Sequence, residues 1–475
     1  MFLTIEEMLR FVKDEKIEMI DFKVIDLIGR WHHVTIPASR FNELTFVQGI
    51  GIDASSYPGY KKVASGDMKI IPDSSTAILD TFCELKTLSL ICDIFEPDGT
   101  PYLRYPRHIA KKAETYLSQI QKGTALFSPE LEFYIFDDIR YASGINQALY
   151  HIDSEEAFWN AGEEDYPNLG YKFPQKGGYH GIPPADATFS LRSEMVRLIE
   201  EAGVAVKYHH HEVGGPGQVE IEVLFDSLLR TADAVMVMKY IIKNIAYLDQ
   251  KVINFMPKPL YQEAGSGMHV HQYISENDIS LFYNPDGYAC LSQLALSYIG
   301  GLLRHGPALL ALTNPSTNSY KRLIPGYEAP VNLFFAAGNR TAAIRIPTYD
   351  TNEQSERIEF RPPDATCNPY LALSAMLMAG LDGVENKIDP SAEGFGPFEV
   401  NIDEMPEDER AKIKVLPTSL EDALNALRHD YDFLLKGEVF TEDLLDTWIK
   451  YKLEKEVEPL QTRPHPYEFE LYSDI

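Results

Sequence analysis

The alternation of apolar and polar residues predicts a mixed fold, in which both strands and helices occur along the chain. Near the start, Thr4 and Glu7 have the spacing of a capping box, so a first helix is expected there. Strands are then predicted at Met19–Asp26, His33–Ile36 and Leu88–Ile94. The stretch 49–80 is rich in Gly, Ser, Asp and Pro and is interpreted as a long functional loop. A turn-forming run at 97–101 ends this part, so residues 1–104 are predicted to form a small α+β domain.

The remainder, residues 105–475, is predicted to form a larger domain of mixed strands and helices. Helical periodicity occurs at Leu191–Ala202, Thr231–Tyr247, Leu291–Leu312, Pro369–Val384, Thr418–Lys436 and Glu442–Glu456. The segment 318–330 is a polar loop with a Pro-Gly turn, which suits a flap over a site. The Gly-, Pro- and acid-rich segment 388–406 is expected to be an exposed loop.

Four predicted strands carry apolar residues on one face and an unusual set of charged residues on the other. These strands are Ser128–Phe136, Gln218–Phe225, Gly267–Ile274 and Glu356–Pro362. Because side chains alternate along a strand with period two, each strand presents one charged face. The residues on those faces are Glu130 and Glu132, then Glu220 and Glu222, then His269 and His271, and last Arg357, Glu359 and Arg361.

Any one of these strands could belong to an antiparallel sheet with one face in water. Together they favour a site, because like charges on adjacent strands are destabilising unless something neutralises them. Glutamates with a histidine suit a hard divalent cation such as Mg²⁺ or Mn²⁺, and arginines suit phosphate or carboxylate. This equipment is typical of phosphoryl transfer, although the chain has no Walker G-x-x-x-x-G-K-[ST] motif. The run His209-His210-His211 alternates between faces, so its members cannot all bind one ion and are expected to serve packing or hydrogen bonding.

Composition excludes several other classes of protein. The 71 acidic and 43 basic residues give a formal net charge of −28, which disfavours nucleic acids and anionic membranes as partners. The four cysteines are scattered, without the spacing of a zinc site or a disulfide framework. The sequence shows no apolar run of membrane-spanning length and no signal-peptide core, so a cytoplasmic location is expected.

Several runs of the sequence, in order, resemble the signature segments of type I glutamine synthetases. They are GDMKIIPDSSTAILDTF, SPELEFYIF, KGGYH, HHHEVGGPGQ, AGSGMHVH, NPSTNSYKRLIPGYEAP, NRTAAIRIP, RIEFRPPDATCNPYLA and RPHPYEFELY. The resemblance implies an α+β architecture, with a small N-terminal β-grasp domain and a large catalytic α/β domain whose antiparallel sheet forms a funnel-shaped active site. It also implies ATP-dependent ligation of ammonia to glutamate, through a γ-glutamyl phosphate, in nitrogen assimilation. The implied assembly is a dodecamer of two hexameric rings, with each site completed by the small domain of a neighbouring subunit.

The resemblance also assigns roles to individual residues. One divalent metal ion would be held by Glu132, Glu212 and Glu220, and another by Glu130, His269 and Glu359. Glu222, which the strand pattern also selects, has no counterpart among the family's metal ligands. Arg322, Arg361 and the backbone at Gly265 would bind glutamate, and Arg340 and Arg345 the transferring phosphoryl group. ATP would contact Phe225, His271, Tyr273 and Arg357. The ammonium pocket would consist of Asp53, Ser56, Tyr179 and Glu212, with Asp53 as the proton acceptor and Glu328 covering the intermediate.

Three positions depart from the family pattern. Ala264 stands where the family usually has Asn, so a contact to the substrate amino acid is missing. Tyr273 and Gln354 replace a smaller hydroxyl residue and a basic residue near the nucleotide. An alternative activity is therefore a γ-glutamyl-amine ligase that uses a polyamine or another amine after the same phosphoryl step, although the retained Asp53 and Glu328 favour ammonia. A catalytically inactive binding protein is a further alternative, which the complete set of expected ligands disfavours.

Overall fold

The computed structural model describes residues 4–61, 63–164, 167–325, 329–400, 402, 405–410 and 412–475. Its N-terminal part is a sheet in the order β2-β1-β6-β4-β3, with β5 paired to β6. These strands are β1 (Met19–Ile25), β2 (Trp31–Pro37), β3 (Ile50–Asp53), β4 (Asp67–Pro72), β5 (Ile78–Asp80) and β6 (Thr87–Phe95). The helix α1 (Ile5–Asp14), whose capping box at Thr4 is present as predicted, buries Met8 and Val12 in the same core as alternate residues of β1.

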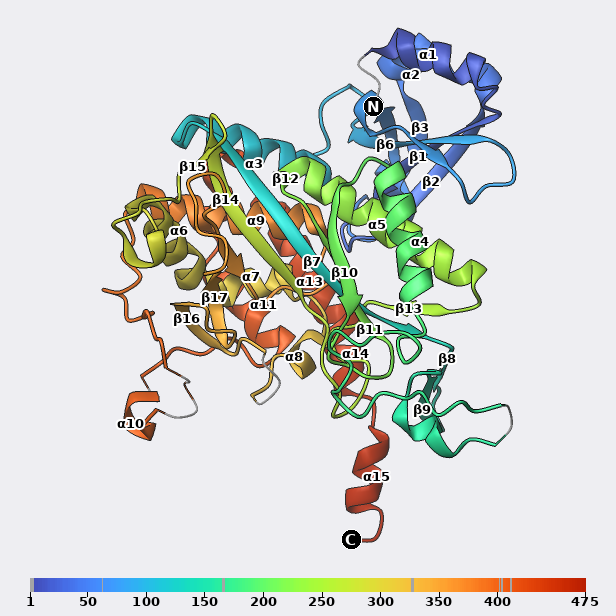
Figure 1. The fold of residues 1–475 in the computed structure, drawn as a ribbon. Coiled ribbons are helices and arrows are strands. Elements are labelled where there is room, and N and C mark those ends of the chain that lie inside the picture. Colours follow the sequence, from blue (N-terminus) through green and yellow to red (C-terminus); the bar gives the residue numbers. More distant parts are fainter. Residues whose placement is uncertain are drawn as a thin grey trace.

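The C-terminal part is built around a long, largely antiparallel sheet in the order β10-β11-β7-β14-β18-β17-β16 (Figure 1). Its strands are β7 (Thr124–Phe136), β10 (Val206–His211), β11 (Gln218–Val223), β14 (Met268–Glu276), β16 (Asn332–Ala337), β17 (Ala342–Ile346) and β18 (Ile358–Phe360). Only β16 and β17 pair in parallel among these strands of the described residues. Short strands β12 (Asp226–Ser227), β13 (Val252–Asn254) and β15 (Ile279–Ser280) pair beside β7 and β14.

Helices cover one side of this sheet and leave the charged side open. The central helix α9 (Pro369–Glu385) is apolar on all sides, with a run of buried residues from Pro369 to Gly383. It packs against α3 (Pro106–Ile120), α5 (Leu228–Leu248), α6 (Gln293–Arg304) and α7 (Gly306–Thr313). Helix α4 (Phe189–Glu201) packs against α5 and β10, and α11 (Leu420–His429) packs against α7. Helix α13 (Glu442–Lys452) is joined to α7 by a hydrogen bond from the Trp448 indole to the carbonyl of Ala311.

The two parts are joined by a buried arginine. Arg107, fully buried on α3, contacts Asp73 and Asp93 of the N-terminal part at 2.8 and 3.1 Å and Asp233 of α5 at 2.9 Å. The segment between β6 and α3 contains the boundary predicted after residue 104, which stays a prediction.

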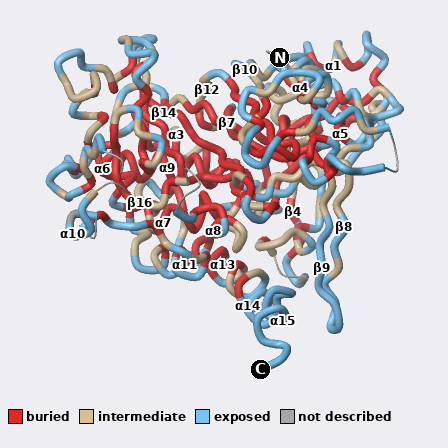
Figure 2. Tube along the Cα trace, turned by 60° about the horizontal axis from the view of Figure 1, so that its bottom comes forward, coloured by how far each residue is buried: buried red, intermediate tan, exposed pale blue. Residues whose placement is uncertain are grey.

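Two segments project from this body. They are the hairpin of β8 (Asp138–Ser143) and β9 (Ala148–Asp153), and the C-terminal helix α15 (Pro466–Tyr472). Both are exposed along most of their length, in contrast to the buried central strands and helices (Figure 2). In the part of the chain that the structure describes, no helix has the length and apolar character needed to cross a membrane.

The structure corrects several predicted elements. The stretch 49–80 contains β3, β4 and β5 and is therefore not one long loop. The single helix predicted at 291–312 is divided into α6 and α7, because Pro307 lies in the first turn of α7 and cannot continue the hydrogen bonding of α6. The helix predicted at 418–436 likewise ends at His429 and is followed by α12 (Asp432–Leu435). The segment 388–406 is not wholly exposed, because Ile388 and Phe395 are buried.

Candidate active site

Strand register brings the charged residues to one face of the sheet. Between β11 and β7, Glu220 lies opposite Glu132, and Glu222 lies opposite Glu130. On the other side of β7, His269 of β14 lies opposite Glu130. Directly opposed residues on paired strands project to the same face, so these acids and the histidine are neighbours across three strands.

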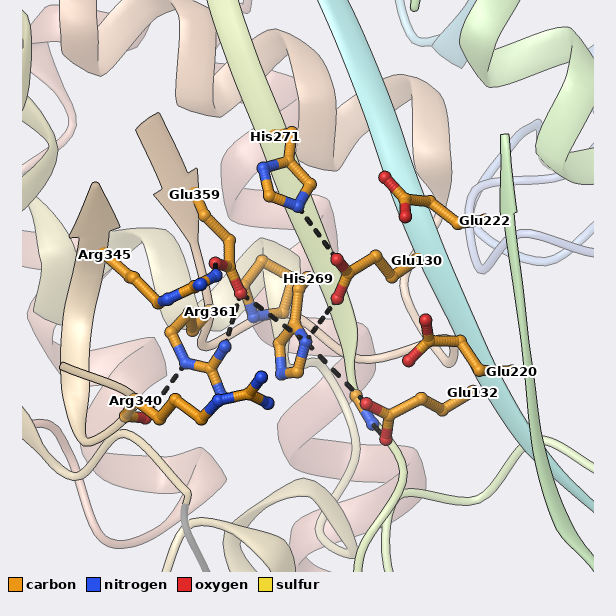
Figure 3. A network of polar contacts seen from close by, with 12 residues as sticks. Glu130, Glu132, Glu220, Glu222, His269, His271, Arg340, Arg345, Glu359 and Arg361 are labelled. Atoms are coloured by element: carbon orange, nitrogen blue, oxygen red, sulfur yellow. Dashed lines mark hydrogen bonds and ion pairs between the residues drawn. The ribbon is translucent and has the colours of Figure 1, made fainter. Parts of the chain in front are cut away.

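Charged residues also lie opposite one another on the strands at either side of β11, β7 and β14. Glu359 of β18 lies opposite His271 of β14 and opposite Arg345 of β17. At the other edge, His210 of β10 lies opposite Glu220. Figure 3 shows Glu130, Glu132, Glu220, His269 and Glu359 projecting from separate strands into a common space.

That space is a cavity of about 640 Å³. It is lined by Glu130, Glu132, Lys176, Tyr179, Tyr208, His210, Glu212, Val213, Gln218, Glu220, Ala264, Gly265, His269, Arg322, Ala329, Arg340, Arg345, Tyr349, Glu359 and Arg361. All the residues predicted as metal ligands are in this set, together with the arginines predicted to bind glutamate and the phosphoryl group. The structure therefore gathers distant parts of the sequence around one hollow.

Glu130, His269 and Glu359 form a compact group of candidate ligands whose atoms lie within 4.8 Å of one another. Nδ1 of His269 is 2.9 Å from Oε2 of Glu130 and 3.8 Å from Oε1 of Glu359. Burial opposes ionisation of Glu130, but hydrogen bonds with His269 and His271 outweigh it and hold its pKa well below the usual value. Burial likewise opposes ionisation of Glu359, but Arg361 and the histidines lower its pKa to about 2.

His210, Glu212 and Glu220 form a second group of candidate ligands. Glu132, which is predicted to bind the same ion as Glu212 and Glu220, lines the same cavity. Nε2 of His210 lies 3.3 Å from Oε1 of Glu220. Burial and the nearby charges of Glu132 and Glu220 raise the pKa of Glu212 to about 8. Oε2 of Glu132 accepts the backbone N–H of Gly267 at 2.7 Å, which holds this carboxylate at the edge of the group.

A third group consists of Glu130, Glu222 and His271. Oε2 of Glu222 and Nδ1 of His271 are buried and have no hydrogen-bond partner among the described residues. Buried polar atoms are normally paired, so both atoms are suited to a bound cation or its water shell. Glu222, which the family pattern does not assign, is thus part of the same charged face.

The arginines occupy the opposite wall of the cavity. Arg322, at the end of α8 (Ser319–Arg322), donates from Nη1 to the carbonyl of Pro362 at 2.7 Å and from Nη2 to the carbonyl of Arg361 at 3.2 Å. Arg345 and Arg361 both donate to Glu359, one to each carboxylate oxygen. Arg340 is exposed in the turn between β16 and β17. A Cβ on Gly265 would lie 2.8 Å from Cγ of Arg322, so this position requires glycine.

The predicted nucleotide residues lie together beside the cavity. The rings of Phe225 and Tyr273 meet edge to face with centroids 4.9 Å apart. The Arg357 guanidinium lies 6.0 Å from the Phe225 ring centroid and 5.4 Å from that of Tyr349. His271 bonds Glu130 at 2.8 Å, which connects this group to the carboxylates.

Two residues predicted for the ammonium pocket, Asp53 and Ser56, are not brought into this cavity. Asp53 and Ser56 lie on the N-terminal part, at the end of β3 and in the 3₁₀ turn after it, and neither is among the described lining residues. Asp53 is exposed and accepts the backbone N–H of Ser55 at 2.9 Å; this hydrogen bonding lowers its pKa. Glu328 lies outside the described residues.

The cavity is also lined by His210, Gln218 and Tyr349, to which the sequence pattern assigns no role in the site. His210 was recoverable, because it lies two residues before Glu212 and opposite Glu220. Gln218 accepts from the N–H of Gly214 at 2.7 Å and donates to the carbonyl of Gly265 at 3.0 Å, so it ties two loops of the site together. Tyr349 lies between strands and has no periodic signal.

Comparison with known proteins gives matches along nearly the whole chain. The family model described as "Glutamine synthetase, beta-Grasp domain" matches residues 16–97, and "Glutamine synthetase, catalytic domain" matches residues 103–472. The chain is 50% identical to a glutamine synthetase of Frankia alni over 478 residues, which covers 100% of both chains. It is also 50% identical to a glutamine synthetase of Nostoc over 477 residues, covering 99% of this chain and 100% of the relative. Among solved structures, a glutamine synthetase of Plasmodium falciparum is similar with a TM-score of 0.89 and 27% identity, covering 99% of both chains.

Proposed function

The chain belongs to the glutamine synthetase family and thus uses ATP to join ammonia to glutamate, and we propose that the cavity on the charged face of the sheet is where this reaction takes place. The observation that carries the proposal is the convergence of carboxylates, His269 and arginines from separate strands on one hollow. A buried acidic cluster facing a basic wall is suited to holding cations and phosphates side by side.

The acidic half of the cavity is assigned to the divalent metal ions that the family uses. Glu130, His269 and Glu359 would hold one ion, a group whose ligand atoms already lie close together. Glu132, Glu212 and Glu220, which line the same cavity, would hold another. Their oxygen and imidazole donors fit Mg²⁺ or Mn²⁺. Burial, together with the charges of neighbouring carboxylates, raises the pKa of Glu212 and of Glu220, and a bound cation would offset both effects. Bound there, such ions would neutralise phosphate oxygens and so reduce repulsion between ATP and an anionic nucleophile.

The basic half is assigned to the substrates. Arg322 and Arg361, which carbonyl and carboxylate groups hold in fixed orientations, would bind the glutamate carboxylates near Gly265. Arg340 and Arg345 would stabilise charge on the γ-phosphoryl group as it passes to the glutamate side chain and forms the γ-glutamyl phosphate. Phe225, His271, Tyr273 and Arg357 would bind the nucleotide beside them.

Ammonia is proposed to react in a pocket shared between subunits. Tyr179 and Glu212 line the cavity of this chain, whereas Asp53 lies at the exposed end of β3 and Ser56 in the turn after it. A neighbouring copy would therefore supply Asp53 to accept the ammonium proton, as in a ring of subunits. We extend this to a dodecamer of two hexameric rings. Glu328 would cover the intermediate and exclude water.

A coupled assay for ADP release tests this assignment. The purified protein is given glutamate, ATP, Mg²⁺ and, in separate reactions, ammonium, putrescine or ethanolamine. We expect turnover with ammonium, and we expect Glu212→Gln to abolish it while the exposed control Glu200→Gln retains it. Full activity of Glu212→Gln would contradict the site assignment.

The same assay examines the amine preference that Ala264 leaves open. Ala264 lines the cavity, and its carbonyl accepts from the Tyr134 hydroxyl at 2.7 Å, so the backbone at this position is anchored although the usual Asn side chain is missing. Turnover with putrescine or ethanolamine that exceeds turnover with ammonium would favour the amine-ligase alternative.

A further inference from the structure

Tyr349 has two arginines against its ring at the edge of the cavity. It lies in the connection between β17 and β18, and 62% of its surface is exposed. The guanidinium carbons of Arg345 and Arg357 lie 5.7 and 5.4 Å from its ring centroid. Both distances are within the range of a cation–π contact.

The two arginines have donors that other groups do not use. Nε of Arg345 and Nε of Arg357 are buried and have no hydrogen-bond partner among the described residues. Arg345 is otherwise held by Glu359. Arg357 is held through Nη1, which lies 3.1 Å from the carbonyl of Ser355 and 3.4 Å from Oδ2 of Asp350. Each guanidinium is thus held by some of its donors and keeps an unused Nε–H. Two arginines in this state can donate hydrogen bonds to an anion with several oxygens.

We propose that Tyr349 is a nucleotide-positioning residue, which orients Arg345 and Arg357 together toward the phosphate chain of ATP. The inference rests on the proposed function, which assigns both arginines to the nucleotide. A flat ring against both guanidinium groups restricts their rotation, so less conformational entropy is lost when phosphate binds. Because the ring acts through the arginines, its effect falls on phosphates and not on the adenine base.

Three variants separate this role from a structural one. Tyr349→Leu removes the aromatic face, Tyr349→Phe keeps it without the hydroxyl, and Tyr247→Leu changes a tyrosine that is 79% exposed at the end of α5. We expect Tyr349→Leu to raise KM for ATP about tenfold, in line with the loss of two cation–π contacts, and to leave KM for glutamate unchanged. Tyr349→Phe and Tyr247→Leu should match the unmodified protein.

A second measurement identifies the part of the nucleotide that is affected. Binding of ADP and of tripolyphosphate, which has no base, is measured by calorimetry with Mg²⁺ present. Tyr349→Leu should weaken both by a similar factor. Weaker binding of ADP alone would mean that the ring stacks on the base. Unchanged binding of both ligands would mean that the ring has no part in nucleotide binding. Either result overturns the inference. Failure of the unmodified protein to bind ADP would instead contradict the proposed function.

Discussion

Arg107 and Asp233 form a buried two-point ion pair, in which Nε and Nη2 of the guanidinium lie 3.0 and 2.9 Å from the two carboxylate oxygens. The same guanidinium also bonds Asp73 and Asp93 of the N-terminal part. Since Asp233 is on α5, one side chain connects the β-grasp sheet to the helices behind the catalytic sheet. Arg107 therefore holds the two parts of the chain together.

The first prediction is that Arg107→Met strongly destabilises the protein. Loss of the cation removes the shared partner of three carboxylates in a buried site, and among the described residues only Asp93 keeps another cation, Lys111. Breaking such a buried ion pair costs about 3–5 kcal/mol. Urea unfolding should therefore show a lower midpoint. Arg197→Met is the matched control, because the Arg197 side chain is 53% exposed and pairs only at the surface with Glu194 and Glu201. An equal fall in the urea midpoint for the two substitutions would contradict a role for Arg107 in holding the two parts together.

The second prediction concerns metal removal. The acids of the cavity repel one another, so we expect EDTA to lower Tm and Mn²⁺ or Mg²⁺ to restore it; an ion at a hundred times its Kd adds about 2.7 kcal/mol. Glu220→Gln should raise Tm of the metal-free protein, because Glu220 is buried among other acids, and should reduce the response to metal. Glu200→Gln, at an exposed position, should respond as the unmodified protein does.

Much of this site could be predicted from the sequence because it depends on the short period of strands. Alternation alone places Glu130 with Glu132 and His269 with His271, whatever the neighbouring strands are. Register then decides which of these meet, and that depends on pairing between residues such as Glu132 and Glu220 that are far apart in the chain. The family resemblance supplied this long-range information.

Other features had no such local signal. The short strands β3, β4 and β5 lie in a polar stretch of the sequence. They form because β3 pairs with β4, while β4 and β5 each pair with β6. Composition therefore indicated a loop there. Tyr349 lies in an irregular connection, where its contacts with Arg345 and Arg357 depend on tertiary structure alone.

The third prediction is a pH dependence of stability at His305. Its Nε2 lies 3.0 Å from Asp382 and its Nδ1 lies 2.9 Å from Asp430, so both nitrogens face carboxylates. Burial lowers the pKa of His305, but these hydrogen bonds outweigh burial and raise it above the usual value. The folded state thus holds the proton more tightly than the unfolded state, so this contribution is full below about pH 6.5 and is lost as pH rises through the folded pKa.

His305→Gln should accordingly lower the free energy of unfolding by about 1–3 kcal/mol at pH 6 and by less at pH 9. The comparison is made by urea unfolding at both values of pH. His429→Gln is the control, because His429 is exposed and bonds only the carbonyl of Asn425 among the described residues. A loss for His305→Gln that is equal at both pH values would contradict a charged His305.

The last prediction concerns Asp53, which lies outside the cavity of its own chain. Asp53→Ala should reduce turnover with ammonium by about a hundredfold or more, the typical contribution of a general base, and spare ADP binding. Asp98→Ala is a closely matched control, because Asp98 is exposed and accepts a backbone N–H two residues later at 2.9 Å, as Asp53 does. Unchanged ammonium affinity and turnover in Asp53→Ala would remove this residue from the site.

Mixing then tests whether neighbouring copies share the site. Asp53→Ala and Glu212→Gln are each inactive by this account, but a ring assembled from both contains interfaces where an intact Asp53 meets an intact Glu212. Random assembly of equal amounts produces about one such interface in four, so co-refolded protein should recover roughly a quarter of the unmodified activity. Because each variant chain keeps only one of the two intact residues, any recovery requires Asp53 and Glu212 of a working site to come from different subunits. No recovery from a mixture that assembles normally would place both residues of a working site in one chain.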